Sequence, residues 1–142
     1  MRFHPSKLVA VLLFITCYQI HADNLEELPA QWQQQLKTVA RMDPALLKQD
    51  VWKDIAEARK NTDALLQQDS TDSTDSKRLA TAYGRLGNLY LTHGLYTSAE
   101  ACYSNAIQLA PEHFPWRYYS AYLNQENGNM AAALSHFKKA VE

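Results

Sequence analysis

The chain has 142 residues, 46% of them hydrophobic and 20% charged, and a formal net charge of -1. These values are typical of a single globular domain and exclude a disordered or fibrous chain. The net charge is near zero, and the sequence shows no basic stripe of the kind that nucleic-acid binders normally carry. We therefore expect no nucleic-acid partner.

Residues 1–22 resemble a secretory signal peptide. Arg2 and Lys7 precede the apolar run LVAVLLFI, and Ala22 provides a small residue for cleavage. The run is shorter than the roughly 20 residues of a membrane span. We therefore expect cleavage after Ala22, export to the periplasm and no membrane span in the mature chain. The alternative is that an uncleaved N-terminal segment anchors the protein.

The mature chain is expected to keep one thiol. Cleavage removes Cys17 and leaves Cys102, so no disulfide can form within the chain. Cys102 lies beside Tyr103 in an apolar helical pattern. We expect it to be a small buried hydrophobe rather than a reactive thiol.

Residues 23–68 are expected to form an N-terminal helical segment. Trp32, Leu36 and Val39 lie at helical spacing and predict a short helix over 24–42.

A second, long amphipathic helix is predicted to start at Asp43 as N-cap, with Pro44 in its first turn. We expect its apolar stripe to pack on the rest of the chain, or alternatively on a second copy of itself. The stripe consists of Leu47, Val51, Ile55, Ala58, Thr62 and Leu65.

Residues 69–76, with the sequence DSTDSTDS, have nothing to bury and predict a polar linker. Ordered structure is expected to resume at Lys77 and to form one domain over residues 77–142. The aspartates lack the Gly and the distal Glu of a calcium loop, so we expect no calcium site.

Small and aromatic residues recur at fixed spacing in the C-terminal domain. The first set is Tyr83, Leu86, Gly87, Tyr90, Ala99, Tyr103, Ala106 and Pro111. This spacing resembles the tetratricopeptide repeat, and repeat one then spans about 80–113.

Repeat two spans about 114–142 and is incomplete at its C-terminal end. Gly128 marks its turn, and the spacing of Ala133, Phe137 and Ala140 matches that of the second helix of repeat one.

The first helix of repeat two has two possible registers. One places Ala121 in the position of Gly87, and the other, slipped by one residue, matches Trp116 and Leu123 to the pattern. The choice decides which tyrosines face inward among Tyr118, Tyr119 and Tyr122.

The glycines of repeat one have different expected roles. Gly87 and Ala99 are small enough to let two helix backbones approach closely. Gly94 suits a turn, because a left-handed conformation is easiest without a Cβ. Gly84 has no place in the repeat pattern and is expected on the open side, where it either leaves room for a ligand or costs stability without an evident reason.

The resemblance implies an all-α fold, in which antiparallel helical hairpins stack as a short right-handed solenoid with one or two extra N-terminal helices. Similarity to tetratricopeptide proteins also implies a concave face that binds a peptide or a helix of another protein. The chain is thus expected to be an exported bacterial adaptor. The candidate peptide-binding residues are Thr81, Arg85, Asn88, Thr92, Tyr118, Tyr122 and Gln125.

No catalytic or metal-binding pattern accompanies the repeats. The histidines of the mature chain are isolated, no Ser lies in a nucleophile elbow, and no Gly-rich phosphate loop is present. We therefore expect a non-enzyme without a metal or a cofactor. Two alternatives stay open: a truncated remnant of a longer repeat protein, or a self-associating module, a homo-oligomer. The uncovered face of such a module carries Leu134, Phe137 and Val141.

Overall fold

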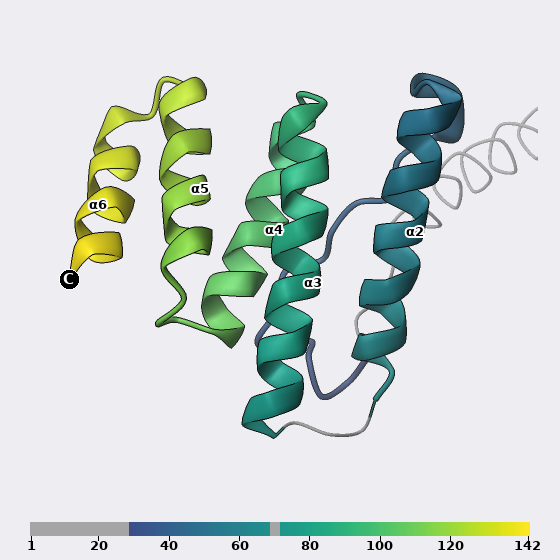
Figure 1. Ribbon diagram of the computed structural model, residues 1–142, viewed down its shortest axis with the longest axis horizontal. Coiled ribbons are helices and arrows are strands. Elements are labelled where there is room, and N and C mark those ends of the chain that lie inside the picture. The colour runs from purple at the N-terminus through teal and green to yellow at the C-terminus, as the bar shows by residue number, and fades with distance from the viewer. Residues whose placement is uncertain (1–28, 69–71) are drawn as a thin grey trace, which may run out of the picture.

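A computed structural model of the protein describes residues 29–68 and 72–142. Within these ranges the chain is all helical and has no strand. The elements are η1 (Pro44–Leu46), α2 (Gln49–Leu66), α3 (Ser73–Thr92), α4 (Tyr96–Leu109), α5 (Phe114–Glu126) and α6 (Met130–Val141). Each α-helix packs on the next one along the chain (Figure 1). This arrangement confirms the expected all-α solenoid of stacked hairpins.

The expected signal peptide, residues 1–22, lies outside the described residues. Among the helices that the structure describes, none combines the length and the apolar character needed to cross a bilayer.

Close packing of α3 against α4 confirms the role expected for Gly87. A Cβ added there would lie 2.9 Å from Cε1 of Tyr103 and 3.1 Å from Cβ of Cys102, closer than side chains normally pack. Tyr90 and Ala99 are fully buried in the same core. The missing side chain of Gly87 therefore lets the two helices approach, as predicted.

Both hairpins turn at a glycine with a left-handed backbone. Gly94 has a φ of 72° and Gly128 a φ of 74°, which residues with a Cβ rarely adopt. α4 ends at Leu109, just before Pro111, which cannot continue a helix. These positions confirm the predicted turns and the predicted end of the second helix.

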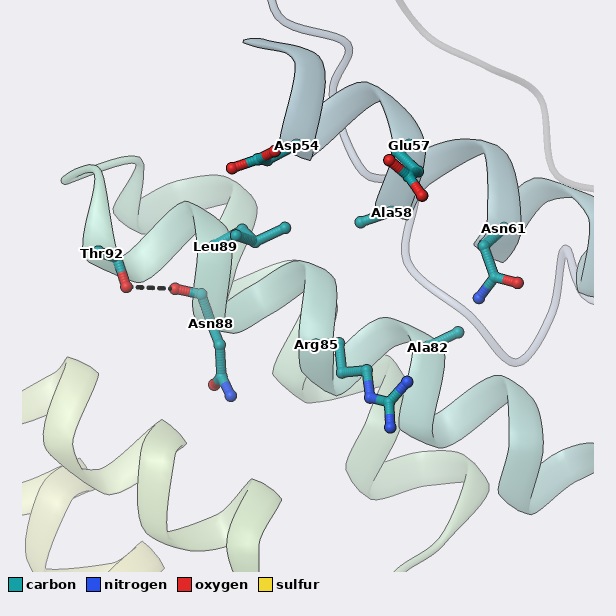
Figure 2. Close-up of a pocket in the computed structure, with 9 residues that line it drawn as sticks. All are labelled: Asp54, Glu57, Ala58, Asn61, Ala82, Arg85, Asn88, Leu89 and Thr92. Carbon is teal, nitrogen blue, oxygen red and sulfur yellow. Dashed lines mark hydrogen bonds between the residues drawn. The ribbon is translucent and has the colours of Figure 1, made fainter. Parts of the chain in front are cut away.

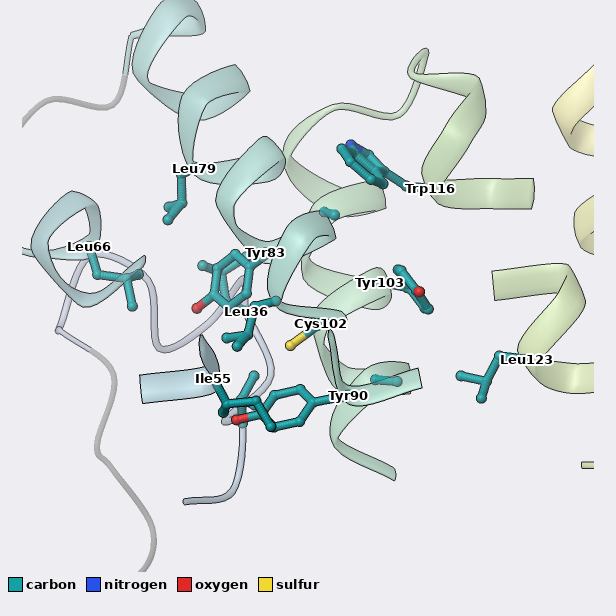
Figure 3. Close-up of a cluster of buried hydrophobic side chains, with 14 of the residues drawn as sticks. Leu36, Ile55, Leu66, Leu79, Tyr83, Tyr90, Cys102, Tyr103, Trp116 and Leu123 are labelled. Atoms are coloured by element: carbon teal, nitrogen blue, oxygen red, sulfur yellow. The ribbon is translucent and has the colours of Figure 1, made fainter. Parts of the chain in front are cut away.

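The register of α5 buries residues from both of the expected alignments. Ala121 is fully buried, as the position of Gly87 requires, and Trp116 and Leu123 are buried in the core that α3 and α4 also form (Figure 3). Tyr118 and Tyr122 are exposed. No slip of the helix is needed, because α5 packs on two neighbours, α4 and α6, and so buries more than one stripe.

Gly84 does not face an open side, contrary to the prediction. It is buried, and a Cβ added there would lie 2.3 to 2.5 Å from three atoms of the Trp116 indole. The missing side chain therefore makes room for Trp116 and not for a ligand. The contact joins the first helix of one hairpin to the first helix of the next.

The helix predicted over 24–42 is wrong where the structure describes it. Residues 30–36 form a single turn, in which the N–H of Leu36 donates to the carbonyl of Trp32 at 2.9 Å, and residues 37–42 are not helical. Trp32 and Leu36 are nevertheless buried in the core, where Figure 3 shows Leu36. The spacing of the apolar residues thus correctly predicts which side chains are buried, but it wrongly predicts a helix.

After the turn, main-chain groups of residues 37–40 form hydrogen bonds with side chains of α2 and α4 instead of with one another. Asn105 of α4 accepts from the N–H of Lys37 at 2.7 Å and donates to its carbonyl at 2.8 Å. Arg59 of α2 donates to the carbonyls of Val39 and Ala40. These four bonds tether residues 37–40 to both helices.

The second predicted helix is interrupted near its start. Asp43 does act as an N-cap, accepting from the N–H of Ala45 at 2.9 Å, but it caps the short η1. α2 begins only at Gln49. Its apolar stripe packs on α3, with Ile55 and Thr62 buried, so the expectation of packing within the chain is confirmed.

The predicted linker over 69–76 is too long. Asp72 accepts from the N–H groups of Thr74 and Asp75 at 2.7 and 2.9 Å, and α3 therefore begins at Ser73 rather than at Lys77. An Asp with two free N–H groups after it is a strong N-cap, so the acidic repeat itself starts the helix.

Candidate functional site

The walls of α2 and α3 enclose an open cavity of about 530 Å³, called here the α2–α3 groove (Figure 2). Ala58, Ala82 and Leu89 supply the apolar part of the lining, and the two alanines have short side chains. Polar and charged side chains project from both walls. The groove is lined by Asp54, Glu57, Ala58 and Asn61 of α2 and by Ala82, Arg85, Asn88, Leu89 and Thr92 of α3.

Arg85, Asn88 and Thr92, all candidates from the sequence, come together in this groove. Thr81 does not line it, and its hydroxyl donates to the carbonyl of Lys77 at 2.9 Å. The candidates on the other hairpin also lie outside the groove: Tyr118, Tyr122 and Gln125 are exposed on α5.

The residues of the α2 wall were not among the candidates predicted from the sequence. Asp54, Glu57 and Asn61 supply all of the polar side chains of this wall. Their spacing places them on one helix face beside the apolar stripe. That spacing was visible in the sequence, but only the packing of α2 on α3 brings this face to the repeat.

Asn88 is the most firmly positioned side chain of the groove. Its Oδ1 accepts from the hydroxyl of Tyr103 at 2.7 Å. Burial raises the pKa of Tyr103, so this hydroxyl keeps its proton and remains a donor. Within residues 29–68 and 72–142 the Nδ2 of Asn88 has no acceptor, so its two N–H donors are available to a ligand.

The two walls of the groove carry opposite charges. Asp54 and Glu57 lie on the α2 wall and Arg85 lies on the α3 wall, all three exposed (Figure 2). Among the described residues, no ion pair joins these three groups. Their charges are therefore available to a molecule that enters the groove.

Aromatic rings continue from the groove to the surface of α5. Tyr103, which holds Asn88, stacks on Tyr119 with centroids 6.0 Å apart. Tyr119 meets Tyr118 edge-on at 5.8 Å, and Tyr118 also contacts Phe137 at 5.7 Å. Although Tyr118 is 44% exposed, its ring is held on several sides. It is thus a preorganised aromatic contact surface.

The described residues offer little for metal or thiol chemistry. In these two ranges no three His, Cys, Asp or Glu side chains gather as metal ligands would. Cys102 is fully buried, and burial raises its thiol pKa well above the ordinary value of 9.0. A buried, protonated thiol is a poor nucleophile.

Residues 80–113 match the family model of the tetratricopeptide repeat. The matched range contains the close helix contact at Gly87 and the turn at Gly94 described above. These residues form a tetratricopeptide repeat. Repeats of this kind are interaction modules, and arrays of them present extended binding surfaces. No curated protein matches the chain.

Proposed function

We propose that this chain is an exported, non-catalytic adaptor that binds an extended segment of another protein in the α2–α3 groove. The observation that carries the proposal is the position of Asn88, whose Oδ1 is held by Tyr103 at 2.7 Å while its Nδ2 is left for a ligand. An amide fixed in this way suits a main-chain carbonyl, which every peptide offers. The concave face of the repeat thus gains a donor that does not depend on the partner's sequence.

The length of the groove suits an extended segment. Asp54 and Asn61 are seven residues apart on α2, which is about 10 Å along the helix axis. An extended chain advances about 3.3 Å per residue. About three residues of a partner therefore fit between the walls, and the flanking residues contact neighbouring surfaces.

The exposed tyrosines of α5 provide the next surface along the solenoid. Tyr118 and Tyr122 are 44% and 42% exposed and lie four residues apart, on one face of α5. Tyrosines are frequent anchors in protein interfaces, because a rigid ring buries much area at small entropic cost. They extend the proposed site beyond the groove.

Peptide selection against the full chain tests the proposed groove. Random twelve-residue peptides displayed on phage are selected on the immobilised protein, and binding is then compared between two variants. Asn61→Trp places a large ring in the groove. Gln108→Trp makes a similar change at an exposed position of α4 that does not line the groove. We expect Asn61→Trp alone to weaken the selected peptides by more than about tenfold. Equal binding to both variants would contradict the site.

Export is tested by the mass of the protein recovered from the cell envelope. Cleavage after Ala22 predicts a mature chain that begins at Asp23. Recovery of the uncut chain in the membrane fraction would instead support the anchored alternative.

Self-association is a second candidate function, favoured by an apolar stripe on α6. Met130, Leu134 and Val141 are 62%, 56% and 81% exposed, and such a stripe commonly marks an interface. Light scattering of the full chain over a range of concentrations tests it. A dimer that Leu134→Glu dissociates and Lys139→Glu, on the opposite face of α6, leaves intact supports this candidate. A monomer at every concentration contradicts it.

A further inference from the structure

The α2–α3 groove has one acidic wall and one basic wall. The carboxylates of Asp54 and Glu57 project from α2, and the guanidinium of Arg85 projects from α3 (Figure 2). Helix geometry places Asp54 and Glu57 about 4.5 Å apart along the axis, so they form a short acidic row. A ligand in the groove therefore meets opposite charge on its two sides.

An extended peptide has the geometry to meet both walls at once. Successive side chains of a strand point in opposite directions, so residues at odd spacing face opposite walls and residues at even spacing face the same wall. Two residues of the peptide that face the same wall are about 6.6 Å apart along the extended chain. Flexible lysine or arginine side chains can bridge the small difference from the spacing of the carboxylates.

Main-chain contact fixes the height of the peptide between the walls. The short Ala58 and Ala82 let a backbone approach, and Nδ2 of Asn88 offers a donor to its carbonyl. With the backbone held at that level, side chains directed to α2 reach Asp54 and Glu57. Those directed to α3 reach Arg85.

We infer that the partner of the α2–α3 groove is an extended segment in which an acidic residue lies between two basic residues. The basic side chains face Asp54 and Glu57, and the acidic side chain faces Arg85. The inference rests on the proposed function, because it names the chemistry of the segment that the same groove binds. The selectivity lies in the alternation of charge and not in net charge alone.

Two capped peptides of identical composition test the alternation. The first contains Lys-Glu-Lys-Leu-Ser, so its acid and its bases face opposite sides when extended. The second contains Lys-Leu-Glu-Ser-Lys, so all three charges face one side. Binding to the full chain is measured at low salt by titration with NMR chemical shifts. We expect the first peptide to bind about fivefold more tightly, the upper end of the range for exposed charge pairs. Equal affinities overturn the inference.

Charge reversal of the α3 wall provides the matched test. In Arg85→Glu both walls are acidic, so the preferred peptide should become Lys-Lys-Lys-Leu-Ser, and the first peptide should lose its advantage. Lys77→Glu is the control, because it makes the same change of charge at a position of α3 that does not line the groove. The inference predicts the wild-type preference in Lys77→Glu. The same reversal in both variants would show an effect of net charge and overturn it.

Failure of the inference and failure of the proposed function give different results. Phage-selected peptides that bind the groove but lack alternating charge overturn the inference and leave the adaptor proposal standing. If no selected peptide is sensitive to Asn61→Trp, both fail.

Discussion

Gly84 lies beneath the indole of Trp116, and this contact shows how one residue type serves two purposes in the same helix. Gly87, three residues later, makes room for Tyr103 and Cys102 of its own hairpin. Gly84 makes room for a ring from the next hairpin. Both glycines cost helix propensity, about 1 kcal/mol each relative to Ala, and both offset that cost by packing.

Replacing Gly84 with Ala tests this role, because the expected change in the free energy of unfolding is opposite in sign to that at an ordinary helix position. At an ordinary helix position the change stabilises a protein by up to about 1 kcal/mol. Here the added Cβ would lie 2.3 Å from the Trp116 ring, so we expect a loss of about 1 to 3 kcal/mol in the free energy of unfolding.

Urea denaturation measures the effect of Gly84→Ala. The double variant Gly84→Ala, Trp116→Leu is the control, because removal of the ring should cancel the penalty of the added methyl. An increase in stability of the single variant would contradict the contact.

The buried thiol of Cys102 predicts a loss of stability at alkaline pH. Burial raises its pKa above the ordinary value of 9.0, so the unfolded chain releases this proton at a lower pH than the folded chain does. The contribution of this thiol to the free energy of unfolding is therefore fully present below about pH 9. Above that pH the free energy of unfolding falls as the pH rises, by at most about 1.4 kcal/mol per pH unit for one group. Cys102→Ala should be less stable at neutral pH but should show a flatter slope near pH 9. Parallel slopes in urea denaturation at several pH values would contradict this origin.

Residue roles that depend on one hairpin were predictable, and those that depend on two were not. Gly87 has the predicted role because its neighbours, Cys102 and Tyr103, lie in the same hairpin, and Gly94 and Gly128 have theirs because each turn requires a positive φ. Gly84 was misassigned because its neighbour, Trp116, lies in the following hairpin. The orientation of that ring depends on how α5 packs against α3 and α4.

At the scale of elements, the segment before η1 shows the limit of hydrophobic periodicity. Trp32 and Leu36 are buried as their spacing predicts, but the chain makes only one turn there. Asn105 and Arg59 bind the main-chain groups after that turn. A pattern of apolar residues cannot reveal a side chain elsewhere that competes for the backbone.

Asn105→Ala tests whether this side chain holds the extended segment. The substitution removes the bonds to the N–H and the carbonyl of Lys37, at 2.7 and 2.8 Å, and leaves both groups without a partner at the site. We expect a loss of about 1 to 3 kcal/mol in the free energy of unfolding and faster amide hydrogen exchange at Lys37.

The control for Asn105→Ala is Asn124→Ala. Asn124 is half-buried, and its side chain donates to the carbonyl of Ser120 in its own helix. This variant should leave exchange at Lys37 unchanged. Equal exchange in both variants would contradict the role of Asn105.

At the scale of the whole molecule, the sequence predicted the repeat and three of the nine residues that line the candidate site. Arg85, Asn88 and Thr92 were found because the repeat pattern identifies which residues of α3 lie outside its apolar packing face. Asp54 and Glu57 were missed because they lie in a segment without a repeat pattern. The groove exists only because α2 packs beside the repeat, and no local signal specifies that packing.

The central claim is that the α2–α3 groove binds a segment of another protein. Site-specific photo-cross-linking in the native cell tests it most directly, with a benzophenone amino acid in place of Thr92 in the groove or of Gln108 on the exposed side of α4. The account predicts that the probe at Thr92 yields one major cross-linked polypeptide, in which mass spectrometry locates the link within a short extended segment. It predicts none from Gln108. The same adducts from both positions, or none from either, would contradict the account.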